Sequence, residues 1–190
     1  GDDVLNGGEG TDSAVFHTTA NLVVDLREGF ATGQGQDQLI SIEHAAGGSG
    51  DDRLLGSGRG NLLQGGAGRD ILMGRGGYDT LEGGAGADRL VGGQGADLLS
   101  GGAGADVFVF APGASHDTIT DFESGLDRIQ LSEALWGGGL GAMGVVETFG
   151  RIEAGHVVLD FGSSSVTILN LASLDALAAD LRLVAAVSDA

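Results

Sequence analysis

Residues 47–109 read, in consecutive blocks of nine, GGSGDDRLL, GSGRGNLLQ, GGAGRDILM, GRGGYDTLE, GGAGADRLV, GGQGADLLS and GGAGADVFV. Every block begins with glycine, and the same chemistry returns at two later positions. The sixth positions are Asp52, Asn61, Asp70, Asp79, Asp88, Asp97 and Asp106, and the eighth positions are Leu54, Leu63, Leu72, Leu81, Leu90, Leu99 and Phe108. A fixed period of this kind indicates a repeat architecture. An earlier partial copy is visible in GDDVLN (1–6) and GGEGTDSAV (7–15).

Each block divides into a turn and a short strand. The glycines of positions one to six permit positive φ and close backbone approach, and positions seven to nine suffice for a minimal strand. A strand that short cannot bury a face alone, so the blocks must stack with their eighth positions inward. Nine residues leave no room for a crossover helix, so the turns themselves must join parallel strands. We therefore expect a coil of two blocks, 18 residues per turn, in which two sheets face each other across a thin leucine-lined core.

Composition excludes several classes of protein. The chain has 190 residues, 38 of them glycine but only one proline, and 42% are hydrophobic, which excludes collagen and argues against generic disorder. The net charge is −18, a surface that repels phosphate backbones and argues against a nucleic-acid partner. All nine cationic residues are arginine, so a lysine-containing phosphate loop is excluded, and without cysteine there is no disulfide or zinc–thiolate site.

The opening of the sequence suggests a piece of a longer polypeptide. The sequence opens with Gly1-Asp2-Asp3, without a visible N-terminal signal peptide. No apolar run approaches the roughly 18 residues of a membrane span. We therefore expect an upstream domain of the same polypeptide and no membrane span.

The repeated turns offer hard oxygen ligands. Each turn exposes several backbone carbonyls and one sixth-position carboxylate, and no imidazole or thiolate occurs in phase. Such ligands in a flexible shell suit Ca²⁺ far better than Zn²⁺ or Cu²⁺, whereas Mg²⁺ prefers a rigid octahedron. The weaker alternative is a stripe of surface charge without metal.

The blocks match the G-G-x-G-x-D-x-U-x nonapeptide, so the chain resembles the RTX (repeats-in-toxin) family, strongly over 47–109 and partially over 1–15. The resemblance implies an all-β fold, a right-handed parallel β-roll. It also implies that each Ca²⁺ lies between successive turns on one edge, held by turn carbonyls and sixth-position aspartates. About six ions would be bound.

Carried over to this sequence, the resemblance stacks Asp52, Asp70, Asp88 and Asp106 on one edge and Asn61, Asp79 and Asp97 on the other. The family geometry uses carbonyls two and four of one turn and one and three of the next. A typical site would join Gly66, Gly68 and Asp70 to Gly83, Ala85 and Asp88. The other expected carbonyl ligands are Gly48, Gly50, Gly65, Ala67, Gly74, Gly76, Gly77, Gly84, Gly86, Gly92, Gly93, Gln94, Gly95, Gly101 and Ala103. Asp117 and Asp121 are expected to finish the last sites on the two edges.

Two blocks depart from the pattern. Block 56–64 carries Ser57, Arg59 and Asn61, and block 74–82 carries Arg75 at its second position. A neutral ligand at the sixth position and a non-glycine at the fourth predict that the site shared by Asn61 and Asp79 is weak or empty.

We expect the chain to divide into three regions: partial repeats and wider coils of the solenoid at 1–46, seven nonapeptides at 47–109, and a cap with a type I secretion signal region at 110–190. In the first region, 22–26 and 39–45 read as strands and 29–37 as a turn, with an inserted loop as the alternative. In the cap, apolar and polar residues alternate over 156–162 and 165–171, which predicts a β-hairpin packed over the open end. Apolar residues at helical spacing predict a helix over 171–187. A solenoid requires such a cap to stop end-on growth.

No catalytic constellation is apparent. There is no H-E-x-x-H zinc motif and no G-x-S-x-G nucleophile elbow, and the four histidines (His17, His44, His116, His156) stand singly. We therefore expect this segment not to be an enzyme, although its parent protein can be one.

These expectations define one leading function and one alternative. The leading one is a calcium-binding module that folds on Ca²⁺ outside a Gram-negative bacterium and supports type I secretion and stability of a larger extracellular protein. The alternative is a Ca²⁺-scaffolded module that binds a polysaccharide or a cell surface. Arg53 and Arg89, which share the seventh position, favour the alternative, and the acidic surface and few aromatic residues oppose it.

Overall fold

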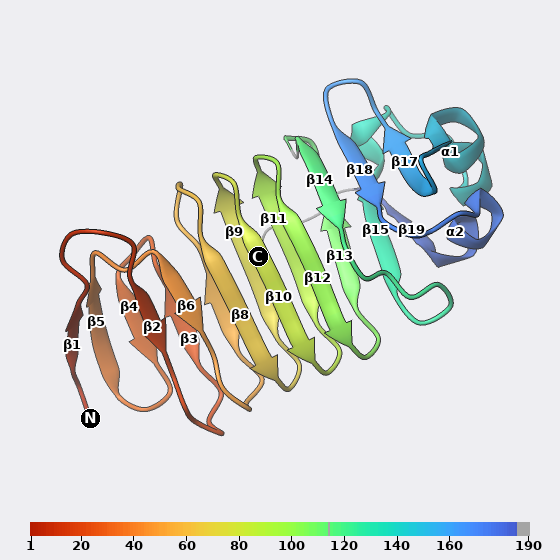
Figure 1. Ribbon diagram of the computed structural model, residues 1–190. Coiled ribbons are helices and arrows are strands. Elements are labelled where there is room, and N and C mark those ends of the chain that lie inside the picture. Colours follow the sequence, from red (N-terminus) through yellow and green to blue (C-terminus); the bar gives the residue numbers. More distant parts are fainter. Residues whose placement is uncertain (114, 186–190) are drawn as a thin grey trace.

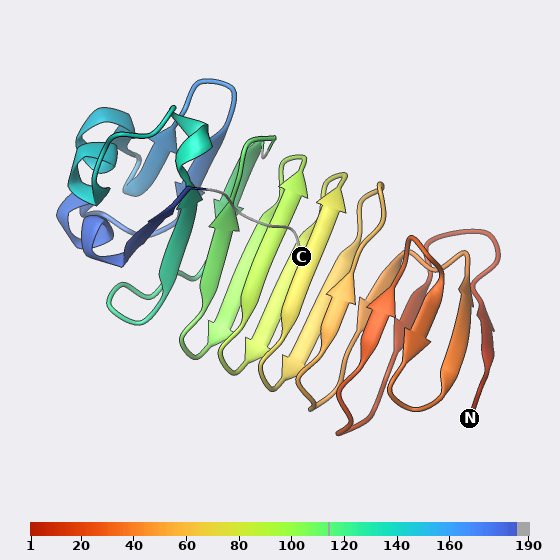
Figure 2. The same cartoon turned by 180° about the vertical axis from the view of Figure 1, so that it is seen from behind.

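The computed structural model describes residues 1–113 and 115–185 and shows an elongated roll, with the N-terminus at one end and the helices at the other (Figures 1 and 2). Two sheets, of ten and nine strands, run along the length of the molecule. Neighbouring repeat strands are parallel throughout. The expected all-β parallel roll is confirmed.

The ten-stranded sheet, called sheet A, contains in spatial order β1 (Val4–Asn6), β5 (Gln36–Ile40), β4 (Phe30–Thr32), β3 (Val23–Asp25), β7 (Arg53–Leu55), β9 (Ile71–Gly76), β11 (Arg89–Gln94), β13 (Val107–Phe110), β15 (Arg128–Ser132) and β19 (Leu181–Val184). The nine-stranded sheet, called sheet B, contains β16 (Gly150–Glu153), β17 (His156–Asp160), β18 (Ser165–Ile168), β14 (His116–Ile119), β12 (Leu98–Ala103), β10 (Thr80–Ala85), β8 (Leu62–Ala67), β6 (His44–Ala46) and β2 (Ser13–Val15). The central strands are longer than the three residues expected, because the ladder continues into the first three positions of the next block.

The register repeats at the expected 18 residues. In sheet B, Leu63 pairs with Leu81, which pairs with Leu99. In sheet A, the corresponding column is Leu54, Leu72, Leu90 and Phe108. All seven eighth-position side chains are 0% exposed, so the leucine core is confirmed.

Residues 16–46 extend both sheets, but not as the sequence indicated. The predicted turn at 29–37 contains β4, which pairs antiparallel with both β3 and β5. Gly29 (φ 74°) and Gly33 (φ 124°) flank β4 and permit the two tight reversals. The predicted strand at 39–45 is instead divided between β5 and β6 by Ser41 (φ 52°), where the chain crosses from sheet A to sheet B.

Beyond the nonapeptides the coils become longer, and a hairpin continues sheet B. Ile119 lies beside Leu99 and Ile129 beside Phe108, so the last coils are longer than 18 residues. The expected hairpin is present as the antiparallel pair β17–β18. It does not lie across the open end, because β18 pairs in parallel with β14 and continues sheet B.

The end of the roll is covered by α1 (Ala142–Phe149) and α2 (Leu174–Asp180), which pack against each other, and a short 3-10 helix, η1 (Glu133–Leu135), precedes them. The helix predicted over 171–187 is wrong in length. It ends at Asp180, and Leu181–Val184 form β19 on the edge of β15, where alternating side chains and backbone pairing outweigh helical spacing. Residues 186 and 187 lie outside the described residues. In the described part of the chain, neither helix has the length and apolar character needed to cross a membrane.

Candidate metal centre

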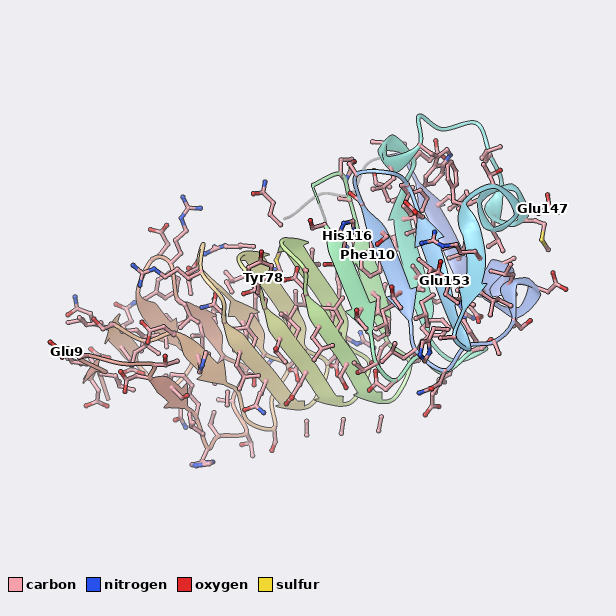
Figure 3. The ribbon with its side chains drawn as sticks, turned by 45° about the horizontal axis from the view of Figure 1, so that its top comes forward. Glu9, Tyr78, Phe110, His116, Glu147 and Glu153 are labelled. Atoms are coloured by element: carbon pink, nitrogen blue, oxygen red, sulfur yellow. The ribbon has the colours of Figure 1, made fainter. Side chains whose placement is uncertain are left out.

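The sixth position of every repeat lies where the chain turns from one sheet into the other. Alternate blocks turn at opposite edges of the roll, so the side chains form two sets. We call Asp52, Asp70, Asp88 and Asp106 the first ladder and Asn61, Asp79 and Asp97 the second ladder. Each of these side chains is at most 3% exposed, whereas Tyr78, labelled in Figure 3, precedes Asp79 in its turn and is 78% exposed.

A continuous set of hydrogen bonds joins the members of each ladder. Oδ1 of one aspartate accepts the backbone N–H of the ladder residue one coil earlier. In the first ladder, Asp88 accepts from Asp70 and Asp106 from Asp88, each at 2.8 Å. In the second, Asp79 accepts from Asn61 at 2.8 Å and Asp97 from Asp79 at 2.9 Å. One oxygen of each carboxylate is thereby committed to holding neighbouring turns in register.

The other carboxylate oxygen has no partner except in Asp52, where Oδ2 accepts the Gly48 N–H at 2.9 Å. Buried Oδ2 atoms without a hydrogen bond occur at Asp70, Asp79, Asp88, Asp97, Asp106 and Asp117. A buried, unpaired carboxylate oxygen is costly unless something positive reaches it. Five of these six oxygens belong to the repeat region and the sixth, on Asp117, belongs to the cap; they lie in two rows and are suited to contact a cation.

Glycine at the first position makes room for these oxygens. A Cβ built on Gly83 would lie 2.5 Å from Asp88 Oδ2 and 2.6 Å from the carbonyl oxygen of Gly101. The carboxylate oxygen and the first-position carbonyl of the next coil therefore both approach the Gly83 backbone. A Cβ on Gly65 would meet Asp70 Oδ2 and the Gly83 carbonyl in the same way. Any other residue would fill this space.

Burial and crowding of charge shift the titration of the ladders. Desolvation, with like charge from neighbouring aspartates, raises the pKa of Asp70 and Asp106 to about 6. The same causes raise the pKa of Asp79 and Asp117 to about 7. Without a cation, the ionised form of the ladder carboxylates is therefore destabilised. A divalent cation would offset both the desolvation and the repulsion between like charges.

The two ladders end differently. Asp117 closes the second ladder, because its Oδ1 accepts the Asp97 N–H at 3.0 Å. The first ladder is closed by Asp127, which accepts the Asp106 N–H at 2.9 Å. Asp121, expected in that place, instead accepts from Gly101 and Gly102. The missed signal was the triplet Asp127-Arg128-Ile129, which repeats the Asp-Arg-Leu of block 83–91.

In the N-terminal partial repeat, further acidic residues form hydrogen bonds like those of the ladders, and the sequence analysis did not single them out. The Asp12 N–H donates to Glu43 Oε2 at 3.0 Å, and Asp12 Oδ2 is buried without a partner. The Asp3 N–H donates to Asp37 Oδ1 at 3.0 Å. Asp12 was detectable, because GGEGTD (7–12) carries aspartate at its sixth position.

The carbonyl residues named from the sequence also lie at the two edges. Gly48, Gly50, Gly65, Gly66, Ala67, Gly68, Gly83, Gly84, Ala85, Gly86, Gly101 and Ala103 belong to the turns of the first ladder, and Gly74, Gly76, Gly77, Gly92, Gly93, Gln94 and Gly95 to those of the second. Third-position carbonyls link the turns directly: those of Ala85, Gln94 and Ala103 accept N–H groups of the preceding coil at 2.7–2.9 Å.

The available donors suit a hard cation. Among the described residues, no three His, Cys, Asp or Glu side chains converge on one point. A site would therefore combine carboxylates of successive coils with turn carbonyls, an all-oxygen set of the kind preferred by Ca²⁺. Two of the histidines accept backbone N–H groups, His44 from Leu62 and His156 from Asn170. Because the donors at the ladders are all oxygens, the ladder residues fit calcium.

Comparison with known proteins gives two family matches. The family model described as peptidase M10 serralysin C terminal matches residues 35–188, and the model described as RTX calcium-binding nonapeptide repeat (4 copies) matches residues 1–14. No curated protein sequence matches the chain.

Among solved structures, the extracellular lipase LipA from Serratia marcescens is similar over 97% of this chain and 34% of its own, with a TM-score of 0.55 and 18% identity. The chain thus spans about a third of the lipase, and at this identity the likeness extends to the fold alone. The solution structure of the AlgE6R3 subunit from the Azotobacter vinelandii mannuronan C5-epimerase is 31% identical over 76% of this chain and 83% of its own, with a TM-score of 0.31.

Proposed function

Because this chain belongs to the peptidase M10 serralysin C-terminal family and carries the RTX calcium-binding nonapeptide repeat, we propose that it is the calcium-driven folding module of a larger secreted polypeptide. The observation that carries the proposal is the pair of aspartate ladders, in which one oxygen of each carboxylate joins the coils and the other, except in Asp52, has no partner. A protein that used these side chains only as surface charge would not bury them at 3% exposure or less.

The residues that hold calcium in this proposal are the ladder aspartates and the turn carbonyls beside them. Asp88 belongs to two neighbouring sites, because it contacts the coils on both sides through its own N–H and its Oδ1. The first-position glycines keep the space beside each Oδ2 open. About six ions would add roughly +12 to the formal charge of −18 and bring it near −6.

Folding and binding are then linked. Without a cation, buried carboxylates repel one another along each ladder, and a roll with so much glycine has little else to offset its chain entropy. Because the ligands of one site come from two coils, the unfolded chain has no preformed site, and binding free energy becomes folding free energy. The module stays unfolded where calcium is scarce and folds where it is millimolar.

This linkage suits passage through a type I secretion channel of a Gram-negative bacterium. The chain crosses unfolded and folds outside, where it stabilises the domain upstream in the same polypeptide. That upstream domain supplies the activity of the parent, such as a protease, a lipase, a polysaccharide-modifying enzyme or an adhesin.

The deciding measurement is far-UV circular dichroism during a Ca²⁺ titration of the EDTA-treated chain, with Mg²⁺ as the control. A cooperative coil-to-β transition specific to Ca²⁺ supports the proposal. A chain that is already folded in EDTA contradicts it, because the cap and leucine core would then suffice alone.

A second candidate function is Ca²⁺-scaffolded binding of an acidic polysaccharide. Arg53 and Arg89 flank Ile71 in one column on the outer face of sheet A, and in the described part of the chain neither forms an ion pair. Alginate pull-down with and without Ca²⁺ tests this candidate. Absence of Ca²⁺-dependent retention, or retention unchanged in an Arg53→Ala/Arg89→Ala variant, removes it.

A further inference from the structure

One turn of the second ladder is built differently from the others. The turn at 56–61 ends in Asn61, and the next coil on this edge carries Arg75 where its successor carries Gly93. Arg75 has a φ of 75°, a left-handed conformation that is unfavourable for a residue with a side chain. Backbone strain of this kind persists only where the surrounding contacts maintain it.

The Arg75 guanidinium joins two other parts of the fold. Its two terminal nitrogens donate to the two carboxylate oxygens of Asp25, each at 2.8 Å, in a bidentate ion pair. Nη1 also donates to the carbonyl oxygen of Gly56 at 2.7 Å. The Asp25 side chain is 6% exposed, and it also accepts the N–H groups of Arg27 and Glu28. Arg75 therefore reaches from β9 across β7 to the end of β3.

The Gly56 carbonyl is at the first position of its block, and the nonapeptide pattern assigns a first-position carbonyl to the calcium ion between its own turn and the turn of the preceding coil. Arg75 thus places a fixed positive charge on an oxygen that a calcium ion would otherwise contact. It balances this charge with a buried carboxylate from outside the ladder. The arrangement is a cation with its own counter-ion, made entirely of protein groups.

Asn61 has no oxygen left for a metal. Its Oδ1 accepts the Ser57 N–H at 2.7 Å, and its Nδ2 donates to the Glu43 carbonyl at 2.7 Å. Asp79 and Asp97, the next residues of the same ladder, each keep Oδ2 buried and without a partner. The 56–61 turn is thus saturated, whereas the turns that follow it are not.

We propose that Arg75 is the residue that excludes calcium from the place between the 56–61 turn and the coil before it and takes over the ion's role there, joining the N-terminal β3–β4–β5 meander to the nonapeptide roll. The inference rests on the proposed function, because it concerns which of the repeated turns bind calcium. In this proposal a permanent ion pair joins the 56–61 turn to the coil before it, and calcium ions join the other repeated turns.

Counting bound calcium in four forms of the chain tests this assignment. The forms are the wild type, Asn61→Asp, Asn61→Asp/Arg75→Gly, and the control Asn61→Asp/Arg69→Ala, which removes the charge of an exposed arginine without a side-chain ion pair among the described residues. Calcium per chain is measured by elemental analysis after equilibrium dialysis, and circular dichroism in saturating Ca²⁺ verifies the fold. Both test substitutions restore the repeat pattern, so we expect each form to fold.

The expected result is an unchanged count in Asn61→Asp and in the Arg69 control, and one additional ion in Asn61→Asp/Arg75→Gly. An additional ion in Asn61→Asp alone overturns the proposal, because Arg75 would then not exclude the metal. No gain in Asn61→Asp/Arg75→Gly also overturns it, because the turn would be closed to calcium for another reason. A wild type that binds no calcium is a different failure, since it removes the proposed function itself.

Discussion

Asp70 and Asp88 are joined across neighbouring coils by one hydrogen bond, from the Asp70 backbone N–H to Asp88 Oδ1 at 2.8 Å, while the Oδ2 atoms of both side chains stay buried without a partner. Each aspartate therefore does two things at once: it sets the register of the turn before it and presents an anionic oxygen to the space between coils. This double role is the reason that metal binding and folding are expected to be inseparable in this chain.

The first prediction compares Asp88 with Asn61. Asp88→Ala removes a carboxylate that the proposed function places in two neighbouring sites, so we expect Ca²⁺ affinity to fall at least about tenfold, with lower cooperativity. Asn61→Ala removes an amide whose polar atoms are already satisfied within the protein, so affinity should change little. Isothermal titration calorimetry of both variants makes the comparison. Equal effects would count against a ligand shared between coils.

The second prediction concerns pH. Burial raises the pKa of Asp79 and Asp117 to about 7, well above the ordinary value of 3.8. These carboxyls hold their protons more tightly in the folded state, so the metal-free fold loses stability as pH rises from about 4 to about 7. Calcium needs the ionised form, so its affinity should fall as pH is lowered through the same window.

Circular dichroism in EDTA at pH 5 and pH 8 measures the first effect, with more β-structure expected at pH 5. Calorimetry in two buffers of different ionisation enthalpy measures the protons that calcium displaces near neutral pH. An Asp79→Asn/Asp117→Asn variant mimics the protonated state and should show a weaker pH dependence in EDTA. If the dependence is the same as in the wild type, these two groups are not its source.

The third prediction uses two adjacent leucines of β12. Leu99 is 0% exposed in the core, whereas Leu98 is 44% exposed on the outer face of sheet B. Leu99→Ala should lower the free energy of unfolding by about 2–5 kcal/mol, and Leu98→Ala should change it by less than about 0.5 kcal/mol. Urea unfolding in saturating Ca²⁺ measures both. Similar losses would mean that the outer face is packed as tightly as the core.

The fourth prediction concerns the cap. Asp180, which is 3% exposed, accepts hydrogen bonds from Ser124 Oγ at 2.7 Å and the Gly125 N–H at 3.1 Å, and it forms an ion pair with Arg128 at 3.1 Å. Asp180→Ala leaves these donors unsatisfied and should lower the free energy of unfolding by roughly 1–3 kcal/mol. Hydrogen exchange in β15 and β19 should accelerate most, because Asp180 fixes the point where the chain enters β19.

Asp175→Ala is the matched control for the cap. Asp175 is exposed on the same helix and has no side-chain hydrogen bond among the described residues, so exchange in β15 and β19 should stay close to that of the wild type. Faster exchange in both variants would assign the effect to helix stability instead of to the buried carboxylate.

The repeat region was predictable because one short unit is used seven times. A turn of six residues and one inward leucine determine how a block stacks on its neighbour, and every further block repeats the same contacts. The 18-residue coil, the buried column Leu54–Leu72–Leu90–Phe108 and the two rows of sixth-position residues all follow from that unit. The flanking segments have no such redundancy. Predictions of their secondary structure were therefore wrong where pairing with distant strands outweighed the local sequence pattern.

Two failures show this competition. The 171–187 segment has helical spacing, yet Leu181–Val184 form a strand, because the edge of β15 offers backbone partners that isolated helical propensity cannot match. The glycines of 29–37 indicate a turn, but they flank the strand β4, since reversals at Gly29 and Gly33 place it between β3 and β5.

The phase of the nonapeptide was enough to predict a parallel roll, its core and the oxygen chemistry of its edges, because these depend on contacts between neighbouring copies of one motif. Only the folded chain could place Asp127 at the end of the first ladder, turn Leu181–Val184 into a strand, and bring Arg75 onto Asp25, which is 50 residues away in sequence. Each of these depends on a partner that is distant in sequence and occurs once. A periodic pattern carries no information about such a partner, because it is decided by which surfaces remain unpaired after the repeats have stacked.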